Sequence, residues 1–205
     1  MKNLLVGVVV GTALMVACSK EAVEQTVAEP RLMKTWETTC TSGAPLPFSK
    51  KSYFEFSGDQ FTEVHTFFTN EDCTEPAAEI QGHGKFSLGE QVIAESGAKP
   101  LTLNYENAQM VALNDKGSEG LDLANFCDVD VWPVGQVVDL TSNSASFTCA
   151  AVTTAPSARY EIYRIDGDKL FVGNAGVGSR AKTEGDRPTQ VDSNTPYVPS
   201  QRSLN

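Results

Sequence analysis

The body of the chain alternates short runs of aromatic and β-branched residues with polar turn residues. The clearest example is SYFEFSGDQFTEVHTFF, residues 52–68, in which two such runs flank the turn residues SGD. A second example, RYEIYRIDGDKLFVGN at residues 159–174, has DGD at its centre. Two apolar runs around a glycine-containing turn predict a β-hairpin.

Other parts of the chain extend this pattern. The region from Asn107 to Phe126 contains Ala, Leu, Met and Glu, but Gly117 and Gly120 interrupt it, so we expect one or two short helical turns there. Short strands at this spacing predict a mainly β, antiparallel β-sandwich or β-barrel. The further predicted strands are residues 34–39, 85–88, 101–105, 136–140 and 146–150.

The first residues form a different pattern. After Lys2, an apolar run of 14 residues extends from Leu4 to Ala17, which is short of the roughly 20 residues of a membrane-spanning helix. A basic start and a short apolar centre are typical of a secretory signal peptide. The residues MVAC that end at Cys18 resemble the lipobox of bacterial lipoproteins, with Met15 where leucine is more common. The alternative is an ordinary cleaved signal peptide with an incidental cysteine.

The lipoprotein resemblance implies that residues 1–17 are removed and that Cys18 carries the lipid. Such a cysteine bears a diacylglycerol and a further acyl chain, and two chains already anchor a protein stably to a membrane. Ser19 stands where Asp commonly marks inner-membrane retention in enteric bacteria. The resemblance therefore implies the outer membrane, with the protein facing the periplasm or the cell surface. Residues 18–30, with three glutamates, predict a flexible tether.

Composition narrows the function classes. The chain has 16 basic and 26 acidic residues and a formal net charge of −10. The basic residues are scattered, which argues against nucleic acid as a partner, because phosphate binding requires clustered Lys and Arg. Residues 31–198 are long enough for one domain with its own core. Residues 199–205 are polar, and we expect a disordered tail there.

With Cys18 assigned to lipid, an even number of cysteines remains: Cys40, Cys73, Cys127 and Cys149. In an exported chain this predicts two disulfides. Three pairings are possible, and we favour the two local ones, Cys40–Cys73 and Cys127–Cys149. The alternative, a four-thiolate zinc site, lacks any CxxC spacing. We predict no metal and no cofactor.

Several segments resemble one known family in order and spacing. The segments CDVDVWPVGQVVDLTS (127–142) with the cysteine at 149, YEIYRIDGDKLFVGN and RPTQVDSNTPY (187–197) resemble the carboxyl part of the adenomatosis polyposis coli down-regulated protein domain. TWETTC (35–40) and FEFSGDQFTEVHTFFTNEDCTEP (54–76) are similar to its opening. The matched pieces span most of the chain from Trp36 to Tyr197.

This resemblance implies a lipocalin-like, half-open β-barrel that is secreted or membrane-tethered. Animal members bind lipidated Wnt ligands through an apolar pocket, and both local disulfides match the family's cysteine positions. This chain carries one such domain where animal members carry two, and a bacterial lipoprotein has no Wnt to bind. Only the general idea of binding an acyl or hydrophobic ligand therefore carries over.

Large apolar side chains supply candidate pocket residues. Each of the two tryptophans lies near a cysteine, and we expect a row of apolar residues from the first hairpin to face inward. These side chains either line an apolar pocket or fill the core. The function predicted is non-enzymatic binding of a hydrophobic or acyl-chain ligand, and the alternative is an envelope-assembly protein that binds a protein partner through the sheet surface. The candidate residues are Trp36, Phe54, Phe56, Val64, Phe68 and Trp132.

The remaining chemistry is less specific. Strand alternation places Glu63 and His65 on one face with Phe61 and Phe67, and a His beside a Glu suits acid–base work. No recognisable nucleophile motif accompanies them, so we interpret them as a cross-strand pair and predict no enzyme activity. His83 lies between two glycines that predict a bend or bulge.

Acidic clusters and one glycine motif are further candidate sites. Oxygen ligands could hold calcium, but the acids do not follow the EF-hand pattern, and we interpret them as solvated loop residues. GVGSRA, residues 176–181, matches a dinucleotide fingerprint by its letters only, because no helix is predicted after it. The acids concerned are Asp115, Glu119, Asp122, Asp128 and Asp130.

Overall fold

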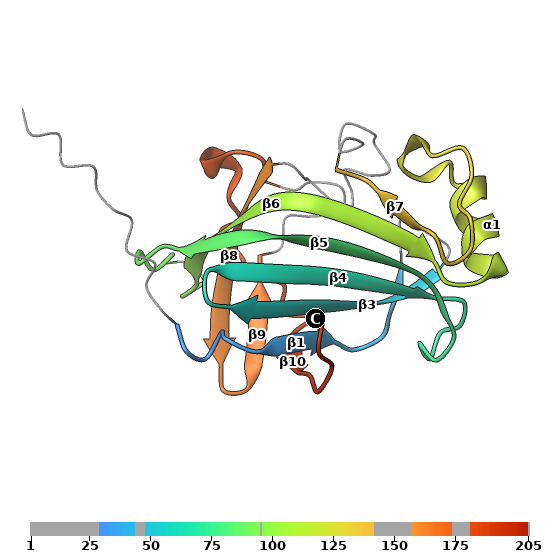
Figure 1. Cartoon of the computed structure of the whole chain (residues 1–205). Helices are drawn as coiled ribbons and strands as arrows, with labels where there is room; N and C mark the ends of the chain where they lie inside the picture. The colour runs from blue at the N-terminus through green and yellow to red at the C-terminus, as the bar shows by residue number, and fades with distance from the viewer. Residues whose placement is uncertain (1–28, 44–47, 95, 142–156, 174–180, 205) are drawn as a thin grey trace, which may run out of the picture.

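The computed structural model describes residues 29–43, 48–94, 96–141, 157–173 and 181–204. Within these ranges eight strands form a closed antiparallel ring, in the order β1-β10-β9-β8-β6-β5-β4-β3 and back to β1 (Figure 1). The predicted antiparallel barrel is thus confirmed. The strands are β1 (Thr35–Thr38), β3 (Phe48–Ser57), β4 (Gln60–Phe68), β5 (Pro76–Leu88), β6 (Lys99–Ala112), β8 (Ser157–Asp166), β9 (Lys169–Val172) and β10 (Tyr197–Pro199).

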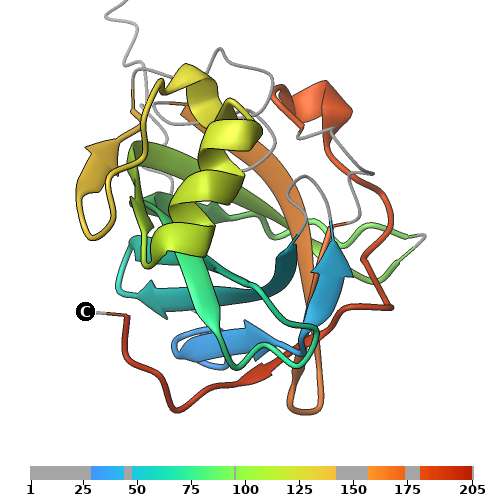
Figure 2. The same cartoon turned by 90° about the vertical axis from the view of Figure 1, so that its right-hand side faces the viewer.

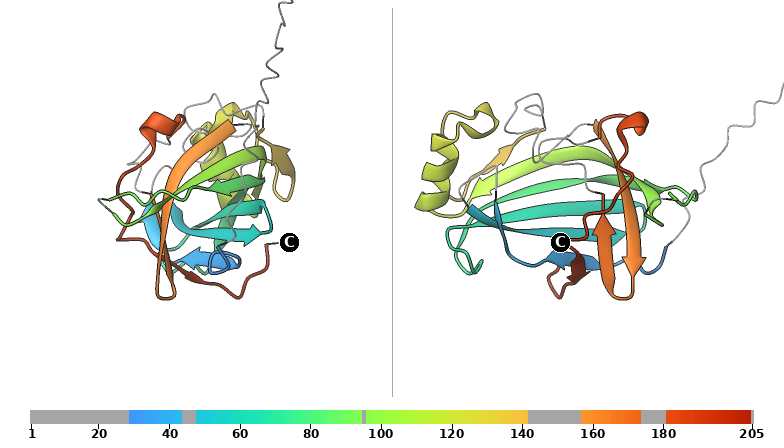
Figure 3. Two further views of the ribbon diagram at one scale, coloured as in Figure 1. Left: turned by 90° about the vertical axis from the view of Figure 1, so that its left-hand side faces the viewer. Right: turned by 180° about the vertical axis from the view of Figure 1, so that it is seen from behind.

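Strand β1 closes the ring because it pairs on both sides. Trp36 lies opposite Phe54 of β3 on one side and opposite Pro199 of β10 on the other. Two short strands extend the sheet outside the ring: β2 (Thr41–Gly43) pairs with β3, and β7 (Val137–Asp139) pairs with β6. Seen from behind, β8 and β9 run across the direction of β3–β5 on the opposite wall (Figure 3).

Both predicted hairpins are present. In the first, Ser57 pairs with Gln60, and in the second, Asp166 pairs with Lys169. Each turn begins with a glycine at positive φ, +62° at Gly58 and +60° at Gly167. Glycine adopts this conformation without a steric penalty, which is why tight two-residue hairpins favour it.

The region from Asn107 to Phe126 divides differently from the sequence prediction. Strand β6 continues to Ala112, the helix α1 spans Asp115–Leu123, and a short 3₁₀ turn, η1, covers Phe126–Asp128. A Cβ at Gly117 would lie 1.9 Å from the Ala77 carbonyl oxygen, and one at Gly120 would lie 2.4 Å from the Phe48 ring. These glycines therefore let α1 pack closely against the barrel; they do not interrupt it.

The predicted short strands have different outcomes. Residues 34–39 correspond to β1 and residues 136–140 to β7, whereas 85–88 and 101–105 are parts of the much longer β5 and β6. Residues 146–150 lie outside the described residues, as does the leader, residues 1–28. A second 3₁₀ turn, η2, spans Glu184–Asp186. No described helix is both long and apolar enough to span a membrane.

One cluster of buried apolar side chains occupies the described part of the barrel interior and extends under α1. Helix α1 covers one end of the barrel (Figure 2). Leu121 of α1 is fully buried, as are Phe126 and Trp132, and the backbone N–H of Trp132 donates to Asp122 of α1. The segment that leads into β1 lies at the opposite end, and its Leu32 is also fully buried. Both ends of the barrel thus contribute side chains to the same core.

The residues after β10, for which a disordered tail was expected, make specific contacts at 200–204. Arg202 Nη2 lies 2.7 Å from Glu79 Oε2, and the backbone N–H of Leu204 donates to Glu55 at 3.0 Å. The Arg202 guanidinium also stacks 4.5 Å above the Tyr53 ring. These contacts hold the segment against the outer face of β3, β4 and β5, because polar side chains of those strands supply its partners.

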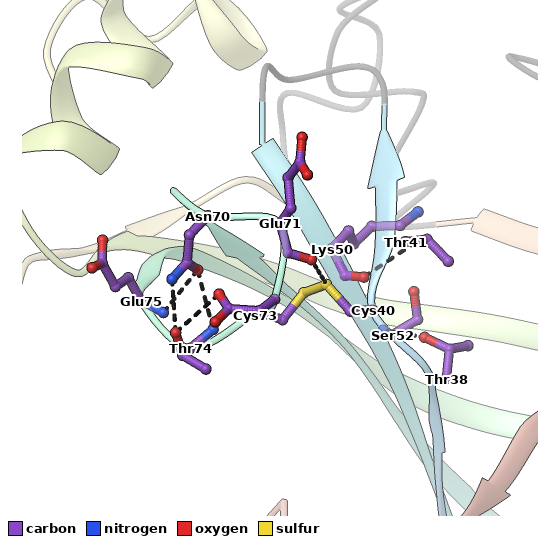
Figure 4. Close-up of a disulfide and its surroundings, with 11 residues drawn as sticks. Thr38, Cys40, Thr41, Lys50, Ser52, Asn70, Glu71, Cys73, Thr74 and Glu75 are labelled. Carbon is purple, nitrogen blue, oxygen red and sulfur yellow. Dashed lines mark hydrogen bonds between the residues drawn. A yellow bond between two sulfur atoms is a disulfide. The ribbon is translucent and has the colours of Figure 1, made fainter.

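The disulfide Cys40–Cys73 is present, as predicted (Figure 4). It joins the residues between β1 and β2 to the turn between β4 and β5, where Asn70 Oδ1 accepts the backbone N–H groups of Thr74 and Glu75. Cys127 is fully buried and takes part in a disulfide. Its expected partner, Cys149, lies outside the described residues, so that pairing stays a prediction.

Candidate functional site in the barrel interior

The register of β3 and β4 decides which side chains enter the barrel. Residues directly opposite each other in a ladder point to the same face of the sheet. His65 lies opposite Ser52, and Glu63 lies opposite Phe54. Phe61 and Phe67 of the same β4 row belong to the core. The predicted face of Phe61, Glu63, His65 and Phe67 is confirmed, and it is the inner one.

Two of the expected inward residues lie on the other face. Val64 pairs with Tyr53, and Phe68 pairs with Ser49, so both point away from Phe54 and Phe56. Grouping these four residues in one inner row is therefore wrong. Val64 and Phe68 are nevertheless buried, 2% and 7% exposed, which shows that apolar character alone does not identify the inner face when the outer face is also covered.

A charged pair occupies the inner face of the barrel. Arg159 Nη1 donates to Glu63 Oε2 at 3.0 Å, and Arg159 Nη2 donates to Glu63 Oε1 at 3.2 Å. The Nε atom of the same guanidinium lies 3.2 Å from Glu161 Oε1. All three residues are buried, with exposed fractions of 4–5%. Two parallel contacts between a guanidinium and a carboxylate fix the orientation of both groups.

Aromatic rings enclose this pair. The Tyr105 hydroxyl donates to Glu63 Oε2, and the Arg159 guanidinium carbon lies 5.3 Å from the Tyr105 ring centroid and 5.8 Å from that of Phe54. The space for Tyr105 exists because residue 82 is glycine: a Cβ there would lie 2.8 Å from the Tyr105 ring. Gly82 is the direct neighbour of Glu63 in the ladder, so the network depends on its missing side chain.

His65 links the carboxylate to a hydroxyl. Its Nε2 lies 3.4 Å from Glu63 Oε1, and its Nδ1 lies 2.8 Å from Ser52 Oγ. A carboxylate only accepts hydrogen bonds, so this placement favours the tautomer with the proton on Nε2 and leaves Nδ1 to accept from Ser52. The Tyr197 hydroxyl also hydrogen-bonds Ser52. The chain of contacts therefore runs from Tyr197 through Ser52 and His65 to Glu63.

Burial and charge shift the pKa values of this network. Burial by itself lowers the pKa of Arg159, but the nearby charges, first that of Glu63, more than offset it and the pKa is raised. For Tyr197, burial raises the pKa of the hydroxyl, and the Glu63 carboxylate raises it further. Arg159 is therefore held as a cation and Tyr197 as a neutral hydroxyl.

The other pocket candidates surround or extend this network. Trp36 and Phe54 are neighbours in the β1–β3 ladder, and the Phe54 and Phe56 rings stack with centroids 5.4 Å apart. Trp132 lies with Phe126 near α1, at 6.2 Å between ring centroids. Among the described residues its indole Nε1 has no hydrogen-bond partner although the side chain is fully buried.

The remaining sequence candidates lie elsewhere. His83 sits at the bulge predicted for its glycines, where the β5–β6 register shifts, and contacts Asn107 on the exposed side. The five acids proposed as solvated are all exposed, and Asp122 accepts the backbone N–H of Trp132 at 2.9 Å. The described residues contain no group of three or more metal-ligating side chains. Most of GVGSRA lies outside the described residues.

Sequence reasoning missed most of the interior polar residues. Arg159 and Glu161 alternate along β8, but alternating charged residues are ordinarily assigned to solvent. No local signal marks Ser52, Tyr105 or Tyr197 as their neighbours, because these residues come from β3, β6 and β10. Gly82 was noted only as part of a bend.

Comparisons with known proteins add no identification: no protein-family model matches the chain, and no curated protein matches it. The site is therefore interpreted from its own geometry. A buried guanidinium–carboxylate pair, an imidazole and three hydroxyls among aromatic rings can bind the polar part of an amphiphilic molecule.

Proposed function

We propose that the chain is a lipid-anchored envelope protein whose barrel binds a hydrophobic or acyl-chain ligand without changing it chemically. The observation that carries this proposal is the buried Arg159–Glu63 pair among the aromatic residues of a closed barrel. Ligand sites are typically apolar cavities with a few convergent polar groups. The inner face of this barrel has that composition.

The charges themselves support a binding role over a purely structural one. A buried ion pair seldom stabilises a protein more than apolar residues of the same volume would, because both charges lose their hydration. The interior already contains enough aromatic and aliphatic side chains for a core. The polar network is then best explained by recognition of a polar group on the ligand.

Trp132 gives independent support. Its buried Nε1 has no acceptor among the described residues, and a buried donor without a partner costs free energy. A ligand oxygen near the end covered by α1 would satisfy this donor. The ligand would then extend from the Arg159–Glu63 pair toward Trp132, along the apolar core.

The membrane part of the proposal rests on the sequence. The lipobox resemblance at Cys18 makes this residue the lipid anchor, and residues 18–30 the tether to the barrel. The family resemblance adds a precedent for barrels of this kind that bind acyl groups. The expected location is the outer membrane, facing the periplasm or the cell surface.

A second candidate function, envelope assembly with a protein partner, has one observation in its favour. Apolar side chains lie exposed on and near α1 and β7, with Leu123 90% exposed and Val131 63% exposed. Exposed apolar residues that gather on one region are typical of interaction surfaces. The other members are Leu113, Val134 and Val137.

Photo-crosslinking separates the two functions. The full chain is reconstituted in lipid nanodiscs with a sixteen-carbon alcohol that carries a diazirine, and labelled peptides are mapped by mass spectrometry. Labelling of β4 and β8 peptides, competed by unlabelled alcohol, is the expected result. Absence of interior labelling, together with a specific crosslink from α1 or β7 to another envelope protein, would favour the second function.

A further inference from the structure

The buried guanidinium of Arg159 already has partners within the protein. Among the described residues Arg159 is the one buried Lys or Arg. Both of its terminal nitrogens donate to Glu63, and its Nε faces Glu161. Phe54 and Tyr105 cover the guanidinium from within 6 Å. Because Glu63 and Glu161 already face this group, a ligand carboxylate could reach it only if Glu63 moved.

The other titratable group of the inner row is committed to the same carboxylate. His65 presents Nε2 to Glu63 and Nδ1 to Ser52. A ligand carboxylate at this level of the barrel would therefore lie beside Glu63 and Glu161. Like charges repel strongly in a medium of low dielectric constant, so an anionic ligand head group is disfavoured here.

An uncharged polar head group meets no such repulsion. The Ser52 and Tyr197 hydroxyls and the His65 ring form a hydrogen-bonded chain, and hydroxyl groups can both donate and accept. A ligand hydroxyl, ester or amide can join such a chain without introducing a charge. The Tyr197 ring also lies against Phe54, with 5.4 Å between the ring centroids.

We infer that the barrel selects acyl ligands with an uncharged polar head group, such as fatty alcohols, fatty esters and fatty amides, over free fatty acids. This inference rests on the proposed binding function and goes further, because it assigns the chemical class of the head group. It follows from the committed hydrogen bonds of Arg159, which a fatty-acid site would have to break.

The test compares matched probes on the full chain in nanodiscs. Sixteen-carbon diazirine probes that end in a carboxyl, a hydroxyl or a methyl ester are crosslinked, and β4 and β8 peptides are quantified. At about pH 8 the acid should label these peptides about tenfold less than the alcohol or the ester, since a buried carboxylate needs a free cation. At about pH 5 the acid is more often neutral, and its labelling should rise while that of the alcohol stays constant.

A charge-removing variant sharpens the comparison. Glu63→Gln removes one of the two carboxylates that face Arg159, so labelling by the acid should rise toward the level of the alcohol. The matched control is Glu55→Gln, on the outer face of the same hairpin, and it should keep the native preference. The pH series on the native chain decides the question if the Glu63 variant does not fold.

The outcomes are distinguishable. Equal interior labelling by acid and alcohol at about pH 8 would overturn the head-group inference and leave the binding function standing. Labelling by none of the probes would overturn the binding function and the inference together.

Discussion

Arg159 of β8 and Glu63 of β4 meet through the interior of the barrel, not along the sheet. Strands β6 and β5 lie between β8 and β4 in the ring, yet Arg159 Nη1 and Glu63 Oε2 are 3.0 Å apart. The contact joins opposite walls, which Figure 3 shows crossing each other. This pair therefore ties the closure of the barrel to the chemistry of its interior.

Removal of the guanidinium should strongly destabilise the fold. Arg159→Met leaves the Glu63 and Glu161 carboxylates in the core without their shared cation, and the free energy of unfolding should fall by about 3–5 kcal/mol. Urea denaturation followed by circular dichroism measures this. Arg202→Met is the control, because its pair with Glu79 is partly exposed and worth under about 1 kcal/mol. Similar losses in the two variants would contradict the special role of the interior pair.

Adding one methyl group at Gly82 tests whether Tyr105 needs the space beside it. Gly82→Ala places a Cβ 2.8 Å from the Tyr105 ring, which must then move away from Glu63. The expected loss is about 1–3 kcal/mol, as for other overpacked sites. Gly185→Ala, where the nearest atom is 3.9 Å away, should leave the melting temperature unchanged. If the two variants have the same melting temperature, Tyr105 does not need the space beside Gly82.

Alkaline pH should lower the free energy of unfolding, in part because the Tyr163 hydroxyl ionises. Burial raises the pKa of its hydroxyl from 10.0 to about 12, and the Glu29 charge adds to this. A tyrosine with a raised folded-state pKa contributes stability that is complete below about pH 10 and is lost between about pH 10 and pH 12. Tyr163→Phe should recover about 1–2 kcal/mol of that alkaline loss, after allowance for solvent screening. Unfolding measured at about pH 8 and about pH 11.5 tests this, and an equal alkaline loss in both proteins would contradict it.

The Cys40–Cys73 disulfide should contribute strongly to stability. It closes a loop with a sequence separation of 33, for which the chain-entropy model predicts about 3–4 kcal/mol. The double variant Cys40→Ser, Cys73→Ser should lose this amount in urea denaturation. Reductant should destabilise the native chain far more than the double variant. Equal sensitivity to reductant would assign the effect to another disulfide.

Lipid attachment can be tested directly at Cys18. Cells fed labelled palmitate should label the native chain and not Cys18→Ser, because Cys18 is the proposed acceptor. The variant should also leave the membrane fraction, since the acyl chains supply the anchoring free energy. The Cys40→Ser, Cys73→Ser variant serves as the control and should retain its label. Label that persists in Cys18→Ser would overturn the lipobox interpretation.

Local sequence signals predicted the hairpins well. The turns at Gly58 and Gly167 need a residue that tolerates positive φ, and this requirement is visible in the residue itself. The even number of cysteines in the exported chain predicted two disulfides, and the preference for local pairing among three possibilities selected Cys40–Cys73. Both kinds of inference use a few neighbouring residues or a simple count.

The inner face of the barrel was predicted less well. Alternation grouped Glu63 with His65 correctly, because side chains two apart on a strand share a face. It could not tell which face is inside, since Val64 and Phe68 on the outer face are also buried. The helical region was predicted to begin at Asn107, but β6 continues to Ala112 and pairs there with β7. Nothing in the alternation of Gln109 and Met110 shows this pairing.

The sequence by itself determined the β-rich class and the two tight turns, because both depend on local backbone conformation. For the four cysteines it left three possible pairings, and the structure decided that Cys40 pairs with Cys73. Only the tertiary structure decided that Arg159, Glu63, Tyr105 and His65 form one buried network. The strands that supply them, β4, β6 and β8, are distant in the sequence, and the groups meet only when the sheet curls into the barrel. The physical reason is that charged side chains tolerate burial only beside compensating partners, and those partners exist only in the closed barrel.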